Sequence, residues 1–156
     1  MRIGLISDTH GLLRPAVLAF LAGSDRIVHA GDVCDAPVLE ALAAIAPVTA
    51  VRGNNDTAAW ASALPASVRV RLGGVVLYAV HDLATIDIDP AAAGVQVVVS
   101  GHSHRPSVEQ RGAVLYVNPG SAGPRRFRLP ISAGELVLDG ASIAARTVAF
   151  GADGGA

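Results

Sequence analysis

Residues 1–10 read MRIGLISDTH, a short apolar run followed at once by polar residues. The apolar run is typical of a buried β-strand. The polar residues that end it include Asp8 and His10, which stand two positions apart. In open α/β sheets, ligands bind where strands end at their carboxyl side. A carboxylate and an imidazole at such an end can bind one metal ion, so the sequence predicts a site here if other strands add ligands.

The same arrangement follows twice more along the chain. Apolar residues at helical spacing predict helices over 14–22 and 36–45, and short apolar runs predict strands over 26–30 and 47–51. Each strand runs into a loop rich in Asp, Asn or Gly. This alternation of strand and helix favours an α/β sheet with parallel strands.

The second half of the chain predicts mostly strands. These are expected over 68–72, 75–80, 95–99, 108–110, 113–117, 127–129, 135–138 and 142–148. Turns are expected at 133–134 and 139–140, and a brief helix around 89–93 has Asp89 as its N-cap. The two halves together predict an α/β fold in which two sheets share one core and helices lie outside.

Composition places further bounds on the protein. A length of 156 residues corresponds to one domain, which we expect over 1–150, followed by a disordered tail over 151–156. Apolar residues make up 51% of the chain and aromatic residues only 4%, so the core must consist mainly of Val, Leu, Ile and Ala. A formal net charge of −1 gives no electrostatic reason to expect nucleic acid or an anionic membrane as a partner.

Three features predict the location of the protein. Cys34 is the single cysteine, which excludes an intramolecular disulfide and fits a reducing compartment. The sequence contains no apolar stretch of about 18 residues that could span a membrane. The first strand begins at residue 2, which leaves no room for a signal peptide. We therefore expect a cytoplasmic protein, and its oligomeric state, with a homo-oligomer as one option, is left open.

Residues that can bind metal stand at five predicted strand ends. They are Asp8, His10, Asp32, Asn54, His81, His102 and His104. Each one alone is more often a turn or a structural residue, but four of the five histidines of the chain lie at these ends. Imidazole, carboxylate and amide ligands without cysteine suit Mn, Fe, Co, Ni or Zn. Seven ligands fit two ions with one bridging carboxylate, an arrangement suited to in-line displacement at phosphorus.

The motifs resemble those of the calcineurin-like metallophosphoesterases, and in particular the small YfcE-like phosphodiesterase branch. They are Asp8-Thr-His10, Gly31-Asp32, Gly53-Asn-Asn-Asp56, His81, Gly101-His-Ser-His104, and Asn118-Pro-Gly-Ser121 followed by Pro124-Arg125. The resemblance extends from residue 2 to about residue 148. It implies a two-sheet β-sandwich flanked by α-helices in four layers, αββα, in agreement with the elements predicted above.

The resemblance also implies a role for each ligand. The first ion is expected at Asp8, His10 and His104, the second at Asn54, His81 and His102, with Asp32 bridging them. A hydroxide held between the ions would attack phosphorus, and Asp32, Asn54 and His102 are the expected catalytic residues. Manganese is the expected metal, with iron, nickel, cobalt and zinc as alternatives.

Two positions depart from the family's pattern. Many members have a histidine where this chain has Asn55, and an asparagine cannot act as a general acid. That change counts against strong activity on esters with poor leaving groups. The branch usually has glycine where this chain has Asp82. Asp82 could orient His81 through a hydrogen bond, although a solvated loop residue is the slightly favoured interpretation.

Four residues near the motifs receive structural interpretations. His29 is expected to be buried and bonded to backbone, and Cys34 to be a small core residue. Asp35 is expected to be the N-cap of the helix that follows it, and Asp56 to orient the loop that carries Asn54.

The remaining candidates are less defined. Arg52, Arg125 and Arg126 could bind a substrate phosphate, although surface arginines are usually only solvated. Trp60 could pack over the site or form a dimer contact, and the sequence does not decide between the two.

The leading functional prediction is a two-metal phosphodiesterase that acts on a small phosphate ester. The alternatives are a phosphomonoesterase on the same site and a non-catalytic scaffold like the retromer subunit of this fold. The complete ligand set favours catalysis over the scaffold. A nuclease for long nucleic acid is disfavoured by the near-neutral charge.

Overall fold

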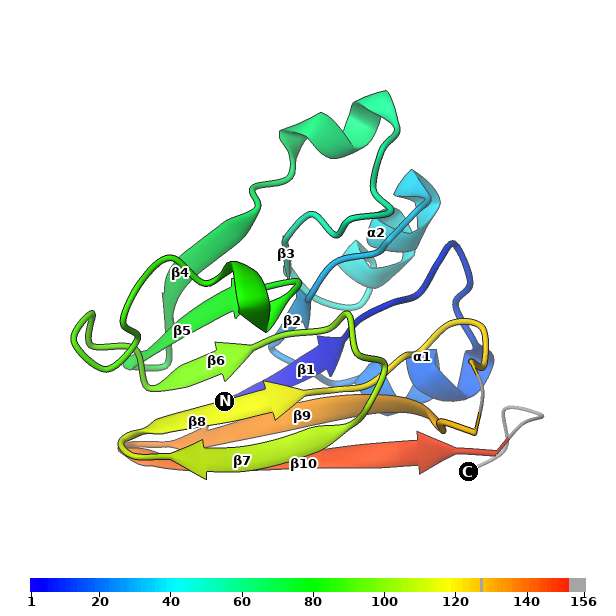
Figure 1. Ribbon diagram of the computed structural model, residues 1–156. Helices are drawn as coiled ribbons and strands as arrows, with labels where there is room; N and C mark the ends of the chain where they lie inside the picture. The colour runs from blue at the N-terminus through cyan, green and yellow to red at the C-terminus, as the bar shows by residue number, and fades with distance from the viewer. Residues whose placement is uncertain (127, 152–156) are drawn as a thin grey trace.

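The computed structural model describes residues 1–126 and 128–151, which form two five-stranded β-sheets packed face to face (Figure 1). The strands of the first sheet are β1 (Arg2–Ile6), β2 (Arg26–His29), β3 (Val48–Ala50), β9 (Ile131–Asp139) and β10 (Ser142–Phe150). Those of the second sheet are β4 (Ser67–Leu72), β5 (Val75–Val80), β6 (Val97–Val99), β7 (Ser107–Arg111) and β8 (Val114–Asn118). The helices are α1 (Pro15–Leu21), α2 (Ala36–Ala43) and two 3-10 turns, η1 (Ala59–Ala63) and η2 (Leu83–Thr85).

Each sheet contains two parallel and two antiparallel strand pairs. The first sheet has the order β10-β9-β1-β2-β3, in which β1, β2 and β3 are parallel. The second has the order β4-β5-β6-β8-β7, in which β5, β6 and β8 are parallel. Because parallel strands end at one edge of their sheet, the loops that follow them are brought to the same side of the sandwich.

The core between the sheets consists almost entirely of aliphatic side chains. Ile3 and Leu5 of β1 face Leu77 of β5 and Val97 of β6, and all of these side chains are buried. The alternating register of β1 places Gly4 and Ile6 on the opposite face. This burial anchors β1 in the middle of the first sheet and fixes the position of the loop that begins at Ser7.

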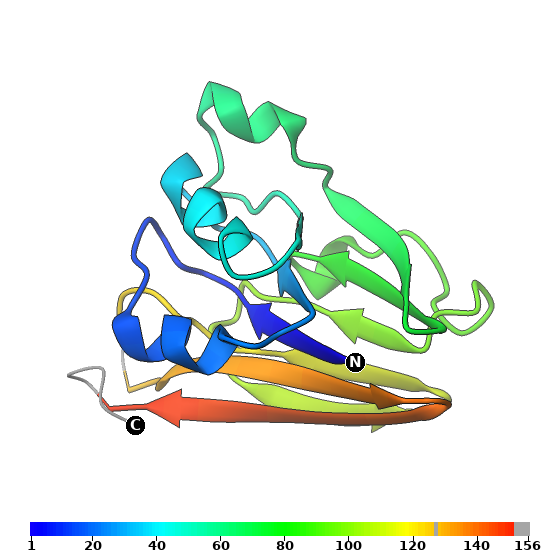
Figure 2. The ribbon, with the colours of Figure 1, turned by 180° about the vertical axis from the view of Figure 1, so that it is seen from behind.

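Both α-helices cover the outer face of the first sheet (Figure 2). Val17 and Leu21 of α1 and Val38 and Leu42 of α2 are buried in one apolar cluster with Ile6 of β1. Helices over 14–22 and 36–45 were predicted, and the observed helices lie inside those ranges. The predicted α/β sandwich of two sheets with helices outside is therefore confirmed, with both α-helices on the first sheet (Figure 2).

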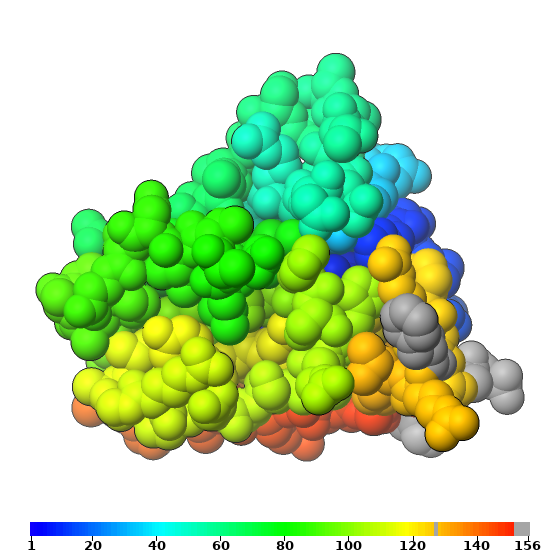
Figure 3. All heavy atoms as spheres, viewed as in Figure 1, coloured from blue at the N-terminus to red at the C-terminus, as the bar shows by residue number. Residues whose placement is uncertain are grey.

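The outer face of the second sheet is covered by turns instead of an α-helix. Tyr78 and Val98 are buried there under a segment that includes Leu83, Ile86 and Ile88. Figure 3 shows this cover as green atoms beside the yellow-green atoms of the β7–β8 hairpin.

A brief helix was predicted around 89–93, but residues 90–94 form a hydrogen-bonded turn and no helix. Asp89 does cap the turn, since its Oδ1 accepts the N–H groups of Ala91 and Ala92. The turn ends at Gly94, which has a positive φ of 71°. From there the chain enters β6 after two further residues, which leaves no room for a helix.

Two further predictions about strands need correction. A turn was predicted at 133–134, but Gly134 lies inside β9, where a side chain would come 3.2 Å from the carbonyl oxygen of Arg146 and 3.5 Å from Leu5. The glycine therefore allows a close approach within the sheet. A strand was predicted over 127–129, but Arg128 lies in a turn and Leu129 in no regular element.

Some predictions lie outside the described residues. Phe127, the first residue of the strand predicted over 127–129, lies outside them. Residues 152–156 of the predicted tail also lie outside them. The division into one domain over 1–150 stays a prediction. None of the described helices combines the length and apolar character needed to cross a bilayer.

Candidate metal centre

Three of the loops at the carboxyl edge share an unusual backbone conformation. In each, two residues separated by one position have a positive φ, between 46° and 65°. The pairs are Asp8 and His10 after β1, Asp32 and Cys34 after β2, and His102 and His104 after β6. Left-handed backbone is unfavourable for residues with a side chain and persists only where the surroundings hold it. Here it turns alternate side chains toward one point.

Backbone hydrogen bonds between loops hold this conformation. The N–H of Asp8 donates to Gly31 and that of His10 to Asp32, both at 3.0 Å. The N–H of His102 donates to Oδ2 of Asp8 at 3.1 Å and so links the two sheets. The three loops therefore form one connected unit.

The first group of predicted ligands lies together. One ligand atom each of Asp8, His10 and His104 lies within 4.8 Å of the others, and Nε2 of His104 is 3.2 Å from Oδ1 of Asp8. The rings of His10 and His104 are stacked with centroids 5.4 Å apart. Asp8 and His104 are buried and His10 is half-buried.

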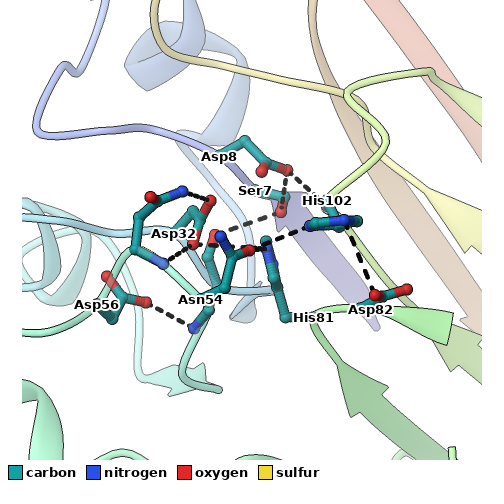
Figure 4. A network of polar contacts seen from close by, with 12 residues as sticks. Ser7, Asp8, Asp32, Asn54, Asp56, His81, Asp82 and His102 are labelled. Carbon is teal, nitrogen blue, oxygen red and sulfur yellow. Dashed lines mark hydrogen bonds and ion pairs between the residues drawn. The ribbon is translucent and has the colours of Figure 1, made fainter. Parts of the chain in front are cut away.

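The second group converges on an amide oxygen. Oδ1 of Asn54 lies 3.1 Å from Nε2 of His81 and 3.1 Å from Nδ1 of His102 (Figure 4). Nδ1 of His81 faces the carbonyl oxygen of Ala30 at 2.7 Å and donates its proton there. The lone pair on Nε2 of His81 is therefore free to bind a cation.

Asp32 lies between the two groups. Its Oδ1 is 3.4 Å from Nε2 of His81, and its Oδ2 is 3.8 Å from Nε2 of His10. The structure thus brings all seven predicted ligands into one cluster, and Asp32 is the carboxylate that faces both halves.

The distances in this cluster match those between ligands of a shared ion. Two atoms that each lie about 2.1 Å from one metal are about 3.0–3.4 Å apart at right-angled or tetrahedral geometry. Four of the five distances given above, from 3.1 to 3.4 Å, agree with this range. Oδ1 of Asp8 is buried without a hydrogen-bond partner among the described residues. A divalent cation satisfies an orphaned carboxylate oxygen that lies beside an imidazole nitrogen. The residues present therefore fit a divalent metal ion.

Burial shifts the pKa values of three ligands toward the values that favour their neutral forms. Burial raises the pKa of Asp8 to about 6 and lowers that of His104 to about 4. Burial also lowers the pKa of His10. Neutral imidazoles are the form that binds metal.

Asp32 and His81 behave as a pair. Burial disfavours the charged Asp32, but hydrogen bonds from His81 and Asn55 outweigh it and hold the pKa of Asp32 below its usual range. Burial likewise opposes a charged His81, and the Asp32 carboxylate outweighs it and raises the pKa of His81. The centre of the cluster therefore favours positive charge beside Asp32.

The loops depend on polar residues whose roles were not all predicted. Asp56 accepts the N–H groups of Cys34 and Gly53, both at 2.7 Å, so it orients the Asn54 loop as expected. The hydroxyl of Ser7 donates to Oδ2 of Asp8 at 2.7 Å. Sequence reasoning missed Ser7, although its place next to a ligand at a strand end was a signal.

Asn118 is a second residue whose role was missed. Its amide donates to the carbonyl oxygen of Gly101 at 2.7 Å and to the hydroxyl of Ser103 at 3.1 Å, and so supports the loop of His102 and His104. The motif that contains Asn118 was noted in the sequence only as a mark of the family.

The other structural interpretations, for His29, Asp35 and Cys34, have different outcomes. His29 is fully buried, and its Nδ1 accepts the N–H of Gly31 as predicted. Asp35 occupies the N-cap of α2, but its side chain makes no capping hydrogen bond. Cys34 is only half-buried, and its sulfur lies 3.5 Å from Nδ1 of His10, so the prediction of a core residue was wrong. The left-handed backbone of Cys34 turns it toward the site.

The two positions that depart from the family pattern both contact ligands. Asn55 donates from its backbone to Oδ1 and from its amide to Oδ2 of Asp32, at 2.8 and 2.6 Å. No hydrogen bond or ion pair joins the side chains of Asp82 and His81. Its carboxylate caps η2 by accepting the N–H of Ala84, and it faces His102 at 3.8 Å. The interpretation in which Asp82 orients His81 therefore named the wrong partner, and the solvated loop residue that was favoured over it is in fact only partly exposed and faces a ligand.

The arginines differ in their distance from the cluster. Nη2 of Arg126 is 3.4 Å from Nε2 of His10. Arg52 lines a groove beside Asn54, His81 and His102, whereas Arg125 lines a separate groove with Arg128.

Trp60 packs against the apolar cluster beneath α1 and α2. It belongs to η1 and is partly buried there. The structure thus assigns it a packing role that the sequence did not predict.

With fold and site in place, the chain belongs to the calcineurin-like phosphoesterase superfamily, whose domain model matches residues 1–140. It is 35% identical over 130 residues to a protein of Methanocaldococcus jannaschii named probable metallophosphoesterase, a match that covers 78% of this chain and 68% of that protein. It is 32% identical to phosphodiesterase YfcE of Escherichia coli in an alignment of 175 positions that covers 93% of this chain and 92% of that protein. The family predicted from the motifs is confirmed.

The fold is also shared by a solved structure that is named for protein sorting and not for an enzymatic activity. Vacuolar protein sorting 29 from Cryptosporidium parvum superposes with a TM-score of 0.84 over 97% of this chain and 92% of that one. The sequence identity is 21%, so this likeness shows the fold alone.

Proposed function

We propose that this protein is a metal-dependent phosphodiesterase that hydrolyses a small phosphate ester at two divalent ions. The observation that carries the proposal is the convergence of six ligand side chains around Asp32, with Oδ1 of Asp8 orphaned among them. The names of the relatives support the activity class, metal-dependent phosphoester hydrolysis. A transition metal such as manganese suits the mixed imidazole, carboxylate and amide ligands.

Each ligand has a defined task in this proposal. Asp8, His10 and His104 would hold one ion, Asn54, His81 and His102 the other, and Asp32 would bridge them. When bound, two such ions lower the pKa of water and neutralise charge on phosphoryl oxygens. The chain itself fixes the ligands: Ala30 sets the tautomer of His81, and Asn55 holds both oxygens of Asp32.

Asn55 also bears on the type of ester. Its amide is engaged with Asp32 and has no acidic proton to give a leaving group. A diester with a good leaving group does not need that proton, because a weakly basic anion such as a nitrophenoxide is stable enough to depart without it. This favours a diester with such a leaving group over one whose leaving group must be protonated.

The substrate test compares two matched esters. Bis-p-nitrophenyl phosphate and p-nitrophenyl phosphate, each with Mn²⁺, should be hydrolysed at different rates, with the diester faster. A faster monoester would favour the phosphomonoesterase over the phosphodiesterase.

A scaffold without catalysis is the second candidate, because the fold is shared with a protein named for sorting. A scaffold has no need of a complete ligand set, and this chain has one. We further propose a cytoplasmic location, supported by the single cysteine, and a substrate that is neither nucleic acid nor membrane, supported by the net charge of −1.

A further inference from the structure

Asp82 stands directly after His81, at the start of η2, and its carboxylate has two partners. Oδ1 accepts the N–H of Ala84 at 2.9 Å, which fixes the side chain against the turn. Oδ2 lies 3.8 Å from Nε2 of His102, which is longer than a hydrogen bond, so the carboxylate acts on the ring through its charge. Figure 4 shows the ring of His102 between Asn54 on one side and Asp82 on the other.

His102 must present a particular nitrogen to serve as a ligand. Its Nδ1 points to the oxygen of Asn54 at 3.1 Å, so Nδ1 is the atom placed among the other ligands. Nδ1 can bind a cation only when the proton of the neutral ring is on Nε2.

Asn54 by itself favours the wrong tautomer. Its Oδ1 is a hydrogen-bond acceptor, and before an ion binds it stabilises a proton on Nδ1 of His102. His81 avoids this conflict because the carbonyl of Ala30 fixes its tautomer. The described residues offer His102 no backbone carbonyl of that kind; the group facing its Nε2 is the carboxylate of Asp82.

We propose that Asp82 is a positioning residue that holds the proton of His102 on Nε2 and so frees Nδ1 for the second ion. The inference rests on the proposed function, in which His102 is a ligand. A carboxylate that accepts from the distal nitrogen of a metal-binding histidine fixes ring and tautomer, and its loss typically weakens metal binding about 10–100-fold. The side chains of His102 and Asp82 are 47% and 36% exposed, so solvent screens the contact and the lower end of that range applies.

Two substitutions separate this role from capping. Asp82→Asn keeps an oxygen for Ala84 but turns an NH₂ group toward His102, which reverses the preferred tautomer. Asp82→Ser also caps a helical turn but is too short to reach the ring. Thermal unfolding of both variants, followed by circular dichroism, shows whether the fold is retained.

The direct readout is the ¹⁵N NMR spectrum of the His102 ring in metal-free protein. We expect the proton on Nε2 in the natural chain and a shift toward Nδ1 in Asp82→Asn. In Mn²⁺ titrations by calorimetry, one of the two sites should lose about tenfold in affinity in Asp82→Asn and less in Asp82→Ser, while the other site is unchanged.

The outcomes distinguish this proposal from the proposed function. An unchanged tautomer, or equal Mn²⁺ affinity in Asp82→Asn and the natural chain, would overturn the role of Asp82. Failure of the natural chain to bind metal would instead contradict the proposed function, whatever the tautomer of His102.

Discussion

The chain reverses direction at both ends of the two sheets, with different residues at each end. At the end on the left of Figure 1, the hairpins turn at Gly73-Gly74, Gly112 and Gly140, and the left-handed positions are glycines. At the opposite end, six left-handed residues carry side chains, and five of them are predicted ligands.

That difference separates a structural end from a functional one. A left-handed residue with a Cβ costs about 1–2 kcal/mol, which glycine avoids. The ligand end keeps the unfavourable backbone because hydrogen bonds between loops hold it and because it turns alternate side chains to one point. The predictions below treat the two ends as matched sites for the same substitutions.

The largest difference between the ends is expected for an aspartate. Asp32→Ala should lower hydrolysis of bis-p-nitrophenyl phosphate on the order of 10³-fold or more, because the carboxylate between the two ligand groups is lost. The same change at Asp139, exposed next to the Gly140 turn, should leave the rate within twofold. Steady-state kinetics with Mn²⁺ measure both, and an unaffected Asp32→Ala enzyme would remove Asp32 from the bridging role.

Glycine substitutions should give the next largest contrast. At Gly53 an added Cβ would lie 2.2 Å from the backbone nitrogen of Asp32, so Gly53→Ala must displace the loop. We expect at least about 3 kcal/mol of lost stability together with weaker metal binding. At Gly112 nothing lies within 4 Å, so Gly112→Ala should cost only the left-handed penalty of about 1–2 kcal/mol. Urea unfolding compares them, and equal losses would contradict the contrast.

The elements were predictable where the pattern was local. A continuous apolar run placed β1, helical spacing of apolar residues placed the helices, and two apolar runs placed the β4–β5 hairpin, since burial decides each of them. Gly134 misled the prediction because its reason for being glycine is the approach of Leu5 and Arg146 from neighbouring strands. Such contacts between distant residues leave no trace in a single sequence.

The site was predictable as a set of residues but not as a geometry. Ligand types at five strand ends indicated the cluster, and the known family motif gave their grouping. The left-handed backbone of His10 and His104 is uncommon for any residue with a side chain, so local propensity does not predict it. The contact between Asp82 and His102 depends on how two loops, after β5 and β6, meet in space.

Asp56 provides a smaller test of the same comparison. Asp56→Asn replaces one acceptor with an NH₂ group that faces the N–H of Cys34 or Gly53. A buried N–H left without a partner costs about 1–3 kcal/mol, so the melting temperature should fall. Asp139→Asn at the opposite end is the control, and differential scanning calorimetry of the two variants should show a drop only for Asp56→Asn.

The smallest effect is expected away from both ends, at Glu135 in β9. Arg2 and Arg146 outweigh the effect of burial and lower the pKa of Glu135. The resulting stabilisation is present above the ordinary pKa of glutamate and is lost as pH falls through the lowered one. Glu135→Gln should cost about 1 kcal/mol at pH 7 and flatten the loss of stability in acid. Identical acid unfolding curves for Glu135→Gln and the natural chain would contradict this.

The central claim is that seven side chains from five loops hold a pair of cations. The most direct measurement is elemental analysis of the natural chain after reconstitution with Mn²⁺ and removal of free metal. We predict close to two ions per chain, falling to one or fewer in Asp32→Ala. A natural chain that retains no ion under these conditions would contradict the account and leave the scaffold as the better description.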